Sequence, residues 1–477
     1  MHTSQFIRFS YDHIYIDMKS VGIHIFRKDL RVVDNLALNA LAVKVDVIIP
    51  IFILDPAQII PNRSNQDYFS PRAARFILDS LIDLNKLCDN KLCVLQGEMI
   101  QALVRICSEK HPDYISFNAD YTSYSKRRDT AILAWCKYQG IETIVNYDDQ
   151  TLARMGTMIK QDKSPYMVYG AFYKNATKIN PTRPKTIKCK FINPAPKLAV
   201  SAEFIRAAYK DKSNHFIGGR SYGLANLHSK ERAKGFAHRD MLINKSFEIS
   251  PYLNFGCISI REVYQYMAKQ KIPATKELYW RDFFLCILRY KPGADSYDAP
   301  MDKAFNKINW RKVKSKQALA EWNSFITCST GYLLIDAGMK QLETTGYIGN
   351  RVRLLLATFW IKYLMIDPLD SEYGAQTGFS RMLMDCSTSQ NKLNHQWITS
   401  ELDLSGRRFA KKNTPSISGR MIRIDNQMIR KYDPELTYIS TWLPEWKNKT
   451  KQDIKSVTPI FEWVSRYDEY CSRIKKD

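Results

Sequence analysis

Five short β-rich runs occur in the first third of the chain, and the later pattern is helical. The runs cover residues 22–26, 46–54, 91–96, 114–118 and 142–146, and amphipathic stretches such as residues 72–87 separate them. Strands that alternate with helices favour a doubly wound parallel sheet with helices on both faces. The pattern predicts an α/β domain with a five-stranded parallel sheet over residues 21–149, preceded by an extension of residues 1–20.

The rest of the chain changes character twice. Residues 150–212 are rich in Lys, Pro, Thr and Asn, which indicates a connector between domains. From residue 213 to residue 477 the apolar pattern is helical, so we expect a second, all-α domain there. Met18 stands just before the first predicted strand, and the sequence leaves open whether residues 1–17 belong to the native protein.

The charge of the chain favours a polyanionic partner. Its 71 Lys and Arg exceed its 48 Asp and Glu, which gives a formal net charge of +23. Such an excess favours phosphate contacts and counterion release, so nucleic acid is the leading candidate. A merely solvated basic surface is the alternative.

The sequence also bears on compartment and metal binding. No apolar run approaches the roughly 20 residues of a membrane span, and the first residues are too polar for a signal peptide. The ten cysteines are scattered, without a CxxC pair or clustered His and Cys ligands, which indicates reduced thiols and no metal site. We expect a soluble intracellular monomer that does not bind membranes, in a compartment that the sequence does not identify.

Polar residues recur inside apolar, helix-like segments of the second domain. A buried Arg, Asp or Asn costs several kcal/mol unless it is paired or coordinates something. This pattern suits a large polar cofactor bound within a helical bundle. The main positions are Glu277, Arg281, Asn350, Arg351, Arg353, Asp385 and Asn391.

Two motifs follow predicted strands of the first domain. Residues 26–35 read Phe-Arg-Lys-Asp-Leu-Arg-Val-Val-Asp-Asn, and Asp34 is a good N-cap for the helix expected next. Together with residues 117–129, this motif resembles the photolyase/cryptochrome flavoproteins, and the resemblance extends over residues 21–446. It implies a helical domain that binds FAD, and an α/β domain that can hold an antenna chromophore. Folate and deazaflavin are the candidates for that antenna, and no residue identifies which.

Residues 246–259 are similar to the segment that holds the flavin phosphates in this family. The segment begins Ser-Phe-Glu-Ile-Ser-Pro-Tyr-Leu. Hydroxyls and free backbone N–H groups at a helix start can hold a pyrophosphate, while an N-cap followed by Pro is the purely structural alternative. The resemblance assigns cofactor contacts to Ser246, Glu248, Ile249, Ser250 and, upstream, Arg239.

Glu277, Trp280 and Arg281 are spaced to share one face of a helix. In the family, the Glu hydrogen-bonds the damaged bases, the Trp stacks on them and the Arg helps hold the flavin. A flipped-out lesion needs such a π surface and such a polar group. A surface ion pair beside a core Trp is the alternative for these residues taken alone.

Residues 345–354 resemble the Gly-(Trp/Tyr)-x-x-Asn-Arg-x-Arg segment of enzymes that repair cyclobutane pyrimidine dimers. The resemblance implies that Asn350 contacts flavin and lesion, that Arg351 contacts a lesion phosphate, and that Arg353 pairs with Asp385 beneath the isoalloxazine. The (6-4) photolyases carry paired histidines near this point, which this segment does not have.

Residues 379–397 resemble the segment beside the redox edge of the flavin. Asn391 matches the Asn that faces flavin N5 in photolyases, a position where signalling cryptochromes commonly have Asp or Cys. Trp397 matches a second aromatic residue of the substrate pocket. Asn391 therefore favours repair over signalling.

The electron-transfer path departs from the family pattern. Most relatives carry electrons to the photoexcited flavin along three tryptophans. The matching positions in this chain hold His395, Pro368 and Trp310. Candidates for another path are Trp360, Tyr363 and Trp397.

A basic tract near residues 406–430 is a candidate DNA contact, through Arg407, Arg408 and Lys411. It is equally a solvated charge run. Taken together, the resemblance predicts light-driven repair of cyclobutane pyrimidine dimers in UV-damaged DNA, catalysed with Glu277, Asn350, Trp280 and Trp397. The alternatives are a cryptochrome-like blue-light receptor without repair activity and a (6-4) photolyase.

Overall fold

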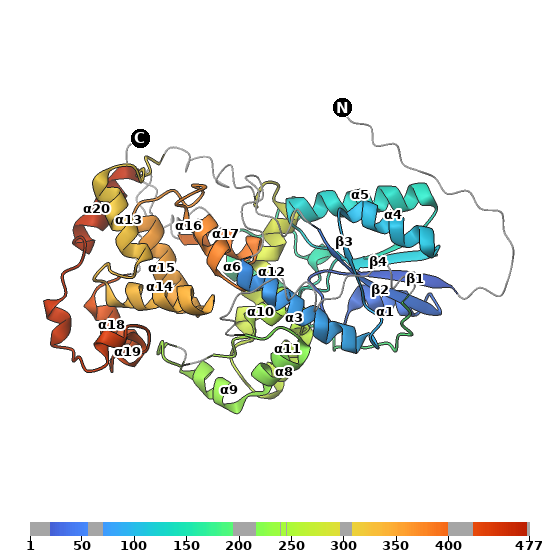
Figure 1. Cartoon of the computed structure of the whole chain (residues 1–477), viewed down its shortest axis with the longest axis horizontal. Coiled ribbons are helices and arrows are strands. Elements are labelled where there is room, and N and C mark those ends of the chain that lie inside the picture. Colours follow the sequence, from blue (N-terminus) through green and yellow to red (C-terminus); the bar gives the residue numbers. More distant parts are fainter. Residues whose placement is uncertain are drawn as a thin grey trace.

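The computed structural model describes residues 20–55, 70–193, 216–238, 240–244, 246–295, 308–398 and 423–474, apart from the side chains at positions 388, 389, 397 and 474. These residues form a sheet half and a helical half that lie side by side (Figure 1). No helix in this described part of the chain is long and apolar enough to cross a membrane.

The sheet has five parallel strands in the order β3-β2-β1-β4-β5. Each predicted strand is present, with its first residue displaced by two positions at most. The predicted fold class, a five-stranded parallel α/β domain followed by helices, is therefore confirmed. The strands are β1 Val21–Phe26, β2 Val47–Leu54, β3 Cys93–Gln96, β4 Tyr114–Asn118 and β5 Glu142–Asn146.

Helices cover both faces of the sheet, and β2 shows why. Ile49, Ile51 and Ile53 point into one core, while Phe52 and Leu54 point into another. A strand buried on both faces reads as a continuous apolar run, as β2 does. The first core lies under α4 (Met99–Glu109) and α5 (Ser123–Gln139), and the second contains side chains of α1 (Leu36–Ala42) and α3 (Pro71–Leu87).

The helix after β1 corrects one expectation. Asn35, not Asp34, caps α1, because the Asn35 side chain accepts a hydrogen bond from the backbone N–H of Leu38. Asp34 has a positive φ of 54°. Its carboxylate points away from the helix and accepts hydrogen bonds from Ser259 and Arg261 of the helical half.

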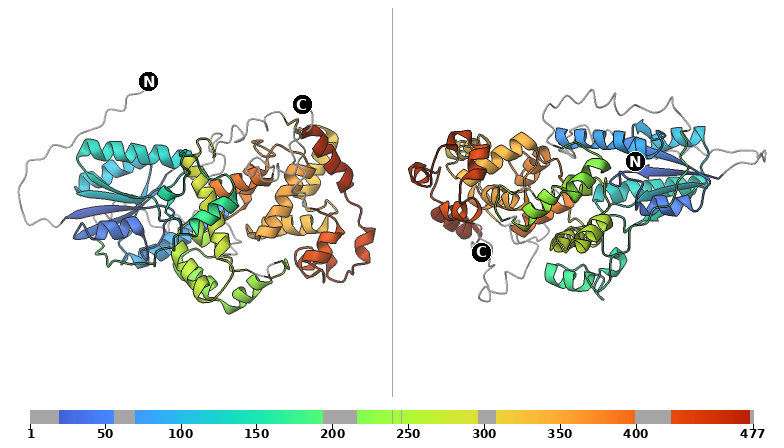
Figure 2. Two further views of the ribbon diagram at one scale, coloured as in Figure 1. Left: turned by 180° about the vertical axis from the view of Figure 1, so that it is seen from behind. Right: turned by 90° about the horizontal axis from the view of Figure 1, so that it is seen from below.

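The helical half begins at the junction with the sheet and continues to the end of the described chain. Its green helices α8 to α11 lie at that junction in both views of Figure 2. The core beneath β2 continues into α10, α11 and α12, so one apolar core spans both halves. A third core joins α13 to α20. The domain boundaries at residues 149 and 212 stay predictions, and residue 212 lies outside the described residues.

The helices of the second part of the chain, in order, are α6 Tyr169–Ala176, α8 Arg220–His228, α9 Lys230–Ala237, α10 Ser250–Asn254, α11 Ile260–Lys269, α12 Thr275–Tyr290, α13 Lys316–Ile326, α14 Leu333–Thr345, α15 Asn350–Thr358, the π-helix η3 Phe359–Tyr363, α16 Ala375–Met382, α17 Thr388–Ile398, α18 Asn426–Tyr432, α19 Thr437–Trp442 and α20 Trp463–Ile474. Short 3-10 turns are η1 Met155–Thr157, η6 Pro444–Trp446 and η7 Asp453–Ser456.

Four buried charges, which we call the seam cluster, join the two halves. Arg31 Nη2 lies 2.8 Å from Asp149 Oδ1, and Arg261 Nε lies 2.7 Å from Asp34 Oδ2. All four side chains belong to residues at most 2% exposed. Arg261 also donates to the backbone carbonyls of Asp148 and Asp149, so its planar guanidinium bridges α11 and the loop after β5.

Candidate functional site

A cavity of about 470 Å³ lies in the helical half, between α10, α12, α15 and α17. It unites segments that are more than one hundred residues apart in the sequence. The predicted residues on its wall are Ser246, Glu248, Ile249, Ser250, Glu277, Trp280, Arg281, Asn350, Arg353, Asp385 and Asn391.

An ion pair closes one side of the cavity. Arg353 Nη2 lies 3.0 Å from both carboxylate oxygens of Asp385, so the pair predicted from the sequence is present. The Ser250 hydroxyl donates to Asp385 Oδ2 at 2.5 Å. Burial alone would lower the pKa of Arg353, but the attraction and hydrogen bond of Asp385, together with the nearby Tyr347 and Cys386, raise that pKa, so the guanidinium stays charged.

The segment before α10 places a carboxylate at the cavity. Glu248 has a φ of 50° and is 8% exposed. A non-glycine residue in this conformation needs support from its surroundings. Arg232 supplies it through an ion pair with the Glu248 carboxylate and a hydrogen bond to the Ser246 carbonyl.

The first turns of α12 carry three predicted residues to the cavity, Glu277, Trp280 and Arg281. The Trp280 indole stacks on the Tyr169 ring at a centroid distance of 3.6 Å and an interplanar angle of 5°. Such stacking fixes the plane of the indole. Arg281 donates to the backbone carbonyl of Gln150, and burial lowers its pKa.

Asp282, next on the same helix, points away from the cavity. Its Oδ2 accepts hydrogen bonds of 2.8 Å from the backbone N–H groups of Leu152 and Ala153. Burial raises the pKa of Asp282 to about 7 in spite of these bonds. Asp282 therefore holds the loop that follows β5 against α12.

Side-chain amides are the commonest polar groups on the cavity wall. Asn391 is 4% exposed, and its amide donates to Cys386 Sγ at 3.0 Å. Asn350 and Asn391 were predicted from the sequence, whereas three other amides and several apolar residues of the wall were not. Asn394 could have been found, because it lies three positions after Asn391 on one helix. The missed lining residues include Asn254, Gln390, Asn394, Phe236, Phe284, Leu354 and Tyr347.

A second cavity of about 490 Å³ adjoins the first and shares Glu248, Glu277 and Asn350 with it. Arg351 lines this second cavity. Its guanidinium pairs with Asp240 and lies 5.0 Å from the centre of the Tyr432 ring. The pair is exposed, with 39% of the Arg351 side chain accessible, so Arg351 can exchange Asp240 for a phosphate at small cost.

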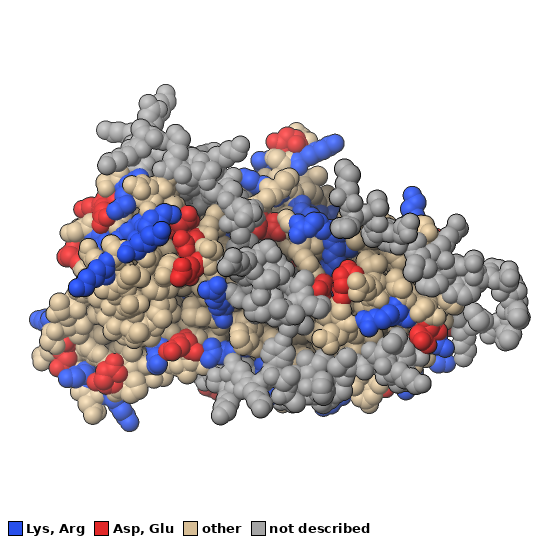
Figure 3. All heavy atoms as spheres, turned by 45° about the horizontal axis from the view of Figure 1, so that its top comes forward, with Lys and Arg blue, Asp and Glu red and all other residues tan. Residues whose placement is uncertain are grey.

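Some predicted site residues lie outside the described residues. They are Arg239, Arg407, Arg408, Lys411 and the side chain of Trp397. Elsewhere, Lys and Arg side chains lie on both halves of the face drawn in Figure 3, mixed with Asp and Glu.

The predicted electron-transfer residues lie in two places. His395 is buried beside Phe379, with burial and the nearby Arg353 lowering its pKa to about 3, so the imidazole is neutral. Trp360 also contacts Phe379, with the two ring centroids 5.5 Å apart. Trp310 lies beside Tyr470 of α20 instead, with the two ring centroids 6.4 Å apart.

The chemistry of the wall fits FAD. Ionised groups, amides and apolar rings alternate around the two adjoining cavities, as the charged phosphates, polar ring edges and flat faces of such a molecule require. Among the described residues, no group of three His, Cys, Asp or Glu side chains could hold a metal ion.

Similarity to known proteins supports FAD as the ligand of this cavity. Residues 22–189 match the family described as DNA photolyase, and residues 274–472 match the FAD binding domain of DNA photolyase. A crystal structure of an archaeal photolyase from Sulfolobus tokodaii, described with two FAD molecules, is 31% identical to this chain. The match covers 96% of this chain and 100% of the archaeal one, with a TM-score of 0.81.

The chain belongs to the photolyase/cryptochrome family. Its cofactor is FAD, and the family of its first domain acts on DNA. The deoxyribodipyrimidine photo-lyase of Alkalihalophilus pseudofirmus is 26% identical over 90% of this chain and 91% of its own length. Cryptochrome DASH of Synechocystis is also 26% identical, over 89% of this chain and 87% of its own length. Identity alone therefore does not separate a photolyase from a cryptochrome.

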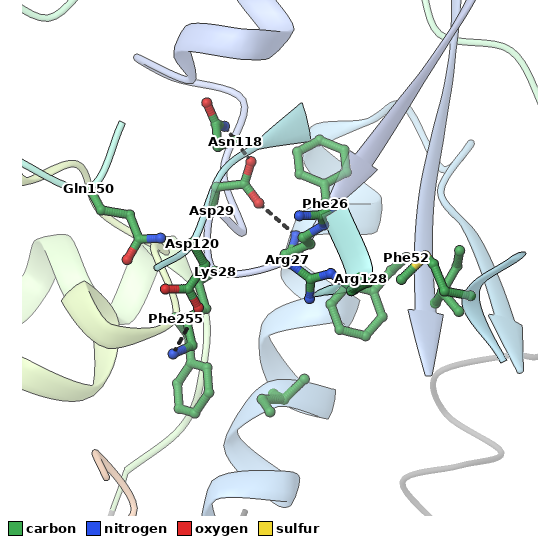
Figure 4. A pocket seen from close by; sticks show the side chains of 13 residues that line it. Phe26, Arg27, Lys28, Asp29, Phe52, Asn118, Asp120, Arg128, Gln150 and Phe255 are labelled. Carbon is green, nitrogen blue, oxygen red and sulfur yellow. Dashed lines mark hydrogen bonds and ion pairs between the residues drawn. The ribbon is translucent and has the colours of Figure 1, made fainter. Parts of the chain in front are cut away.

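A much smaller hollow lies at the carboxyl ends of the strands, where ligands of such sheets commonly sit. It measures about 40 Å³. Figure 4 shows its charged lining, in which Asp29 accepts hydrogen bonds from Asn118 and from the Arg27 backbone while Lys28 faces Asp120. In this conformation it has room for water rather than for a chromophore.

Proposed function

We propose that this protein repairs cyclobutane pyrimidine dimers in UV-damaged DNA, with light as the energy source. The observation that carries the proposal is that Glu277, Trp280 and Asn350 line the same cavity as Asn391 and the Arg353–Asp385 pair. Predicted lesion-facing and cofactor-facing residues are thus neighbours. Direct electron exchange between a flavin and a lesion requires such closeness.

Bound FAD would supply the chemistry, which is light-driven transfer of one electron between the reduced flavin and the dimer. The protein binds and orients the cofactor and the lesion. Trp280, fixed by Tyr169, offers an aromatic face for a flipped base pair, and the Glu277 carboxylate accepts hydrogen bonds from its N–H edges. Trp397 is proposed as a second stacking surface.

Asn350 is proposed to contact both the flavin and the lesion, because it lines both adjoining cavities. Its amide can donate to one partner and accept from another. Asn391 is proposed to face the redox edge of the flavin. Its neutral amide donates a hydrogen bond without adding an anion, which suits stabilisation of negative charge on a reduced ring.

Two observations weigh against the alternatives. A (6-4) photolyase of the usual kind has paired histidines, whereas the single histidine of residues 345–398, His395, packs against Phe379. A signalling cryptochrome commonly carries Asp or Cys at the position where this chain has Asn391.

The test is a repair assay with chemically reduced holoprotein and blue light. Two oligonucleotides are compared, one with a cyclobutane dimer and one with a (6-4) photoproduct. We expect light-dependent repair of the first alone. Repair of the second alone would establish the (6-4) alternative, and repair of neither, with FAD fully bound and reduced, would favour a light receptor.

An antenna chromophore, folate or deazaflavin, stays a separate prediction. The Sulfolobus tokodaii structure implicates a novel light-harvesting cofactor in that protein, which adds a flavin to the candidates. In this chain, Nε and Nη2 of the buried Arg27 have no hydrogen-bond partner among the described residues, so they are donors for a water or an anionic group at the carboxyl ends of the strands. Chromatography of the chromophores released by denaturation identifies any second one.

A further inference from the structure

A continuous row of aromatic rings leads from the cavity helix α17 to the surface. The His395 ring lies 5.3 Å from Phe379, Phe379 lies 5.5 Å from Trp360, and Trp360 lies 5.3 Å from Trp322. These are centroid distances of rings in van der Waals contact. The four rings come from α17, α16, η3 and α13, so only the tertiary structure brings them together.

The two tryptophans of this row differ in burial, as a path to solvent requires. Trp360 is 1% exposed, while Trp322 is half-buried at the surface of α13. Tyr373 stands beside Trp322 with a centroid distance of 5.3 Å. Indole forms a radical cation, without loss of a proton, more easily than a phenol, an imidazole or a benzene ring does, so Trp360 and Trp322 are the positions where an electron vacancy can reside.

The structure holds the Trp360 indole in a defined place. Its Nε1 donates to the Tyr373 carbonyl at 2.7 Å. Gly378 makes room for the ring, because a Cβ at that position would clash with the indole. Trp360 also lies in the π-helix η3, a rare element that is frequent at functional sites.

Trp310, the tryptophan that matches the outermost relay position of the family, is not part of this row. Its ring contacts Tyr470 at 6.4 Å, and Tyr470 leads to Tyr467 and Tyr363 at 6.3 and 6.2 Å. From there the path to Trp360 needs two further rings, Phe359 and Phe325. The route from Trp310 is therefore longer and consists mostly of tyrosine and phenylalanine.

We propose that Trp360 and Trp322 form the relay by which the oxidised flavin of this protein is photoreduced. Trp360 gives one electron to the photoexcited flavin, across Phe379 and His395, and becomes a radical cation. Trp322 fills that vacancy with its own electron. The Trp322 radical then takes one electron from a thiolate in solution, which leaves as a thiyl radical, and two thiyl radicals couple to a disulfide.

No covalent bond to the protein forms in these steps. Each photochemical cycle moves one electron from thiol to flavin, with protons drawn from water. Two cycles complete the reduction. The relay depends on FAD binding but not on the proposed repair of dimers, since repair moves an electron between flavin and lesion directly. Photoreduction is therefore tested without DNA.

The experiment compares Trp360→Phe, Trp322→Phe and Trp310→Phe with the wild-type holoprotein under blue light and dithiothreitol. The loss of oxidised flavin absorbance gives the rate, and laser-flash absorption follows the tryptophan radical. We expect Trp360→Phe and Trp322→Phe each to lower the rate by about tenfold or more, equivalent to ~1.4 kcal/mol in barrier. The radical signal should vanish in Trp360→Phe and become short-lived in Trp322→Phe.

Trp310→Phe is the matched control, because Trp310 is also half-buried and also a tryptophan. Its rate should stay within about twofold of wild type. An unchanged rate and radical signal in Trp322→Phe, with flavin content equal to wild type, would overturn the proposal. A loss of photoreduction in Trp310→Phe alone would overturn it as well. Because Trp322 is half-buried, its variant decides the matter even if Trp360→Phe fails to fold.

Discussion

The seam cluster and the flavin cavity both place charge inside the protein, but they do so differently. In the seam, two arginines and two aspartates face one another at 2.7 and 2.8 Å, and no residue of the four is more than 2% exposed. In the cavity, charged groups share the wall with five amide side chains, those of Asn254, Asn350, Gln390, Asn391 and Asn394.

The paired charges of the seam cluster stabilise the fold, whereas the polar groups of the cavity wall are placed to bind a ligand. A set of matched ion pairs neutralises its own charges and leaves little net charge for another molecule. Amides carry both donors and acceptors, so they can serve the mixed polar edge of a flavin or a base. We therefore expect seam variants to change stability with and without FAD, and cavity variants to change mainly what the protein binds.

The largest effect is expected for Arg261→Met. Loss of this guanidinium leaves Asp34 with an unpaired buried charge, and breaking such a pair costs about 3–5 kcal/mol. Urea unfolding should show this loss at neutral pH in both the flavin-bound and the flavin-free protein. The matched control is Lys340→Met, which breaks the exposed pair with Glu343 and should cost less than about 1 kcal/mol. Equal costs for the two variants would contradict the seam's structural role.

Asp282→Asn tests how the stability of the junction between the two halves depends on pH. Because burial raises the folded-state pKa to about 7, above the usual value of 3.8, the folded protein binds a proton that the unfolded chain has released. The contribution of Asp282 to stability is therefore greatest below pH 4 and is lost as pH rises through 7. The total change is on the order of 4 kcal/mol.

An asparagine can still accept the hydrogen bonds from Leu152 and Ala153, and it does not ionise. We expect Asp282→Asn to unfold at higher urea than wild type at pH 8, with the difference shrinking toward pH 5. A difference that stays constant across this range would exclude the raised pKa as its cause.

Asp385→Asn should weaken FAD binding more than it weakens the fold. The variant keeps the shape of the side chain but removes the charge that orients Arg353 on the cavity wall. A hydrogen bond to a charged group is worth about 1.5–3 kcal/mol, or roughly 10- to 150-fold in affinity. Flavin titration of the stripped protein measures the affinity, and thermal unfolding of the same flavin-free sample serves as the control. Unchanged affinity beside a large loss of stability would place Asp385 with the seam cluster rather than with the cavity.

Glu277→Gln is expected to have an intermediate effect, on repair alone. The carboxylate is proposed to accept hydrogen bonds from the lesion, so its neutral isostere should slow repair by about 1–3 kcal/mol in transition-state terms while FAD content stays at the wild-type level. Single-turnover repair in saturating light measures the effect. Wild-type repair by Glu277→Gln would remove Glu277 from the catalytic residues.

The smallest effect is expected for Arg351→Ala, and it concerns DNA binding. Arg351 is exposed and paired with Asp240, so its loss should hardly change stability. If it contacts one phosphate, the slope of log affinity against log salt should fall by about one unit. Lys340→Ala is again the control, and an identical slope in both variants would mean that Arg351 does not contact DNA.

The sequence by itself determined the strands and the cofactor segments. Strands such as β4 (Tyr114–Asn118) are found because alternation and turn residues are local signals, and the Arg353–Asp385 pair was implied by family motifs that keep their spacing. Local signals did not identify the N-cap of α1 correctly. Asp34 and Asn35 are both residue types that cap helices well, and only the structure assigns the cap to Asn35.

Tertiary structure alone decided the long-range contacts. Arg261 meets Asp34 across 227 residues, and Trp322, Trp360 and Phe379 meet from three elements. No periodicity predicts such meetings, because they depend on how whole helices pack. A buried charge or an indole ring takes its role from the neighbours that this packing supplies, and those neighbours are distant in the chain.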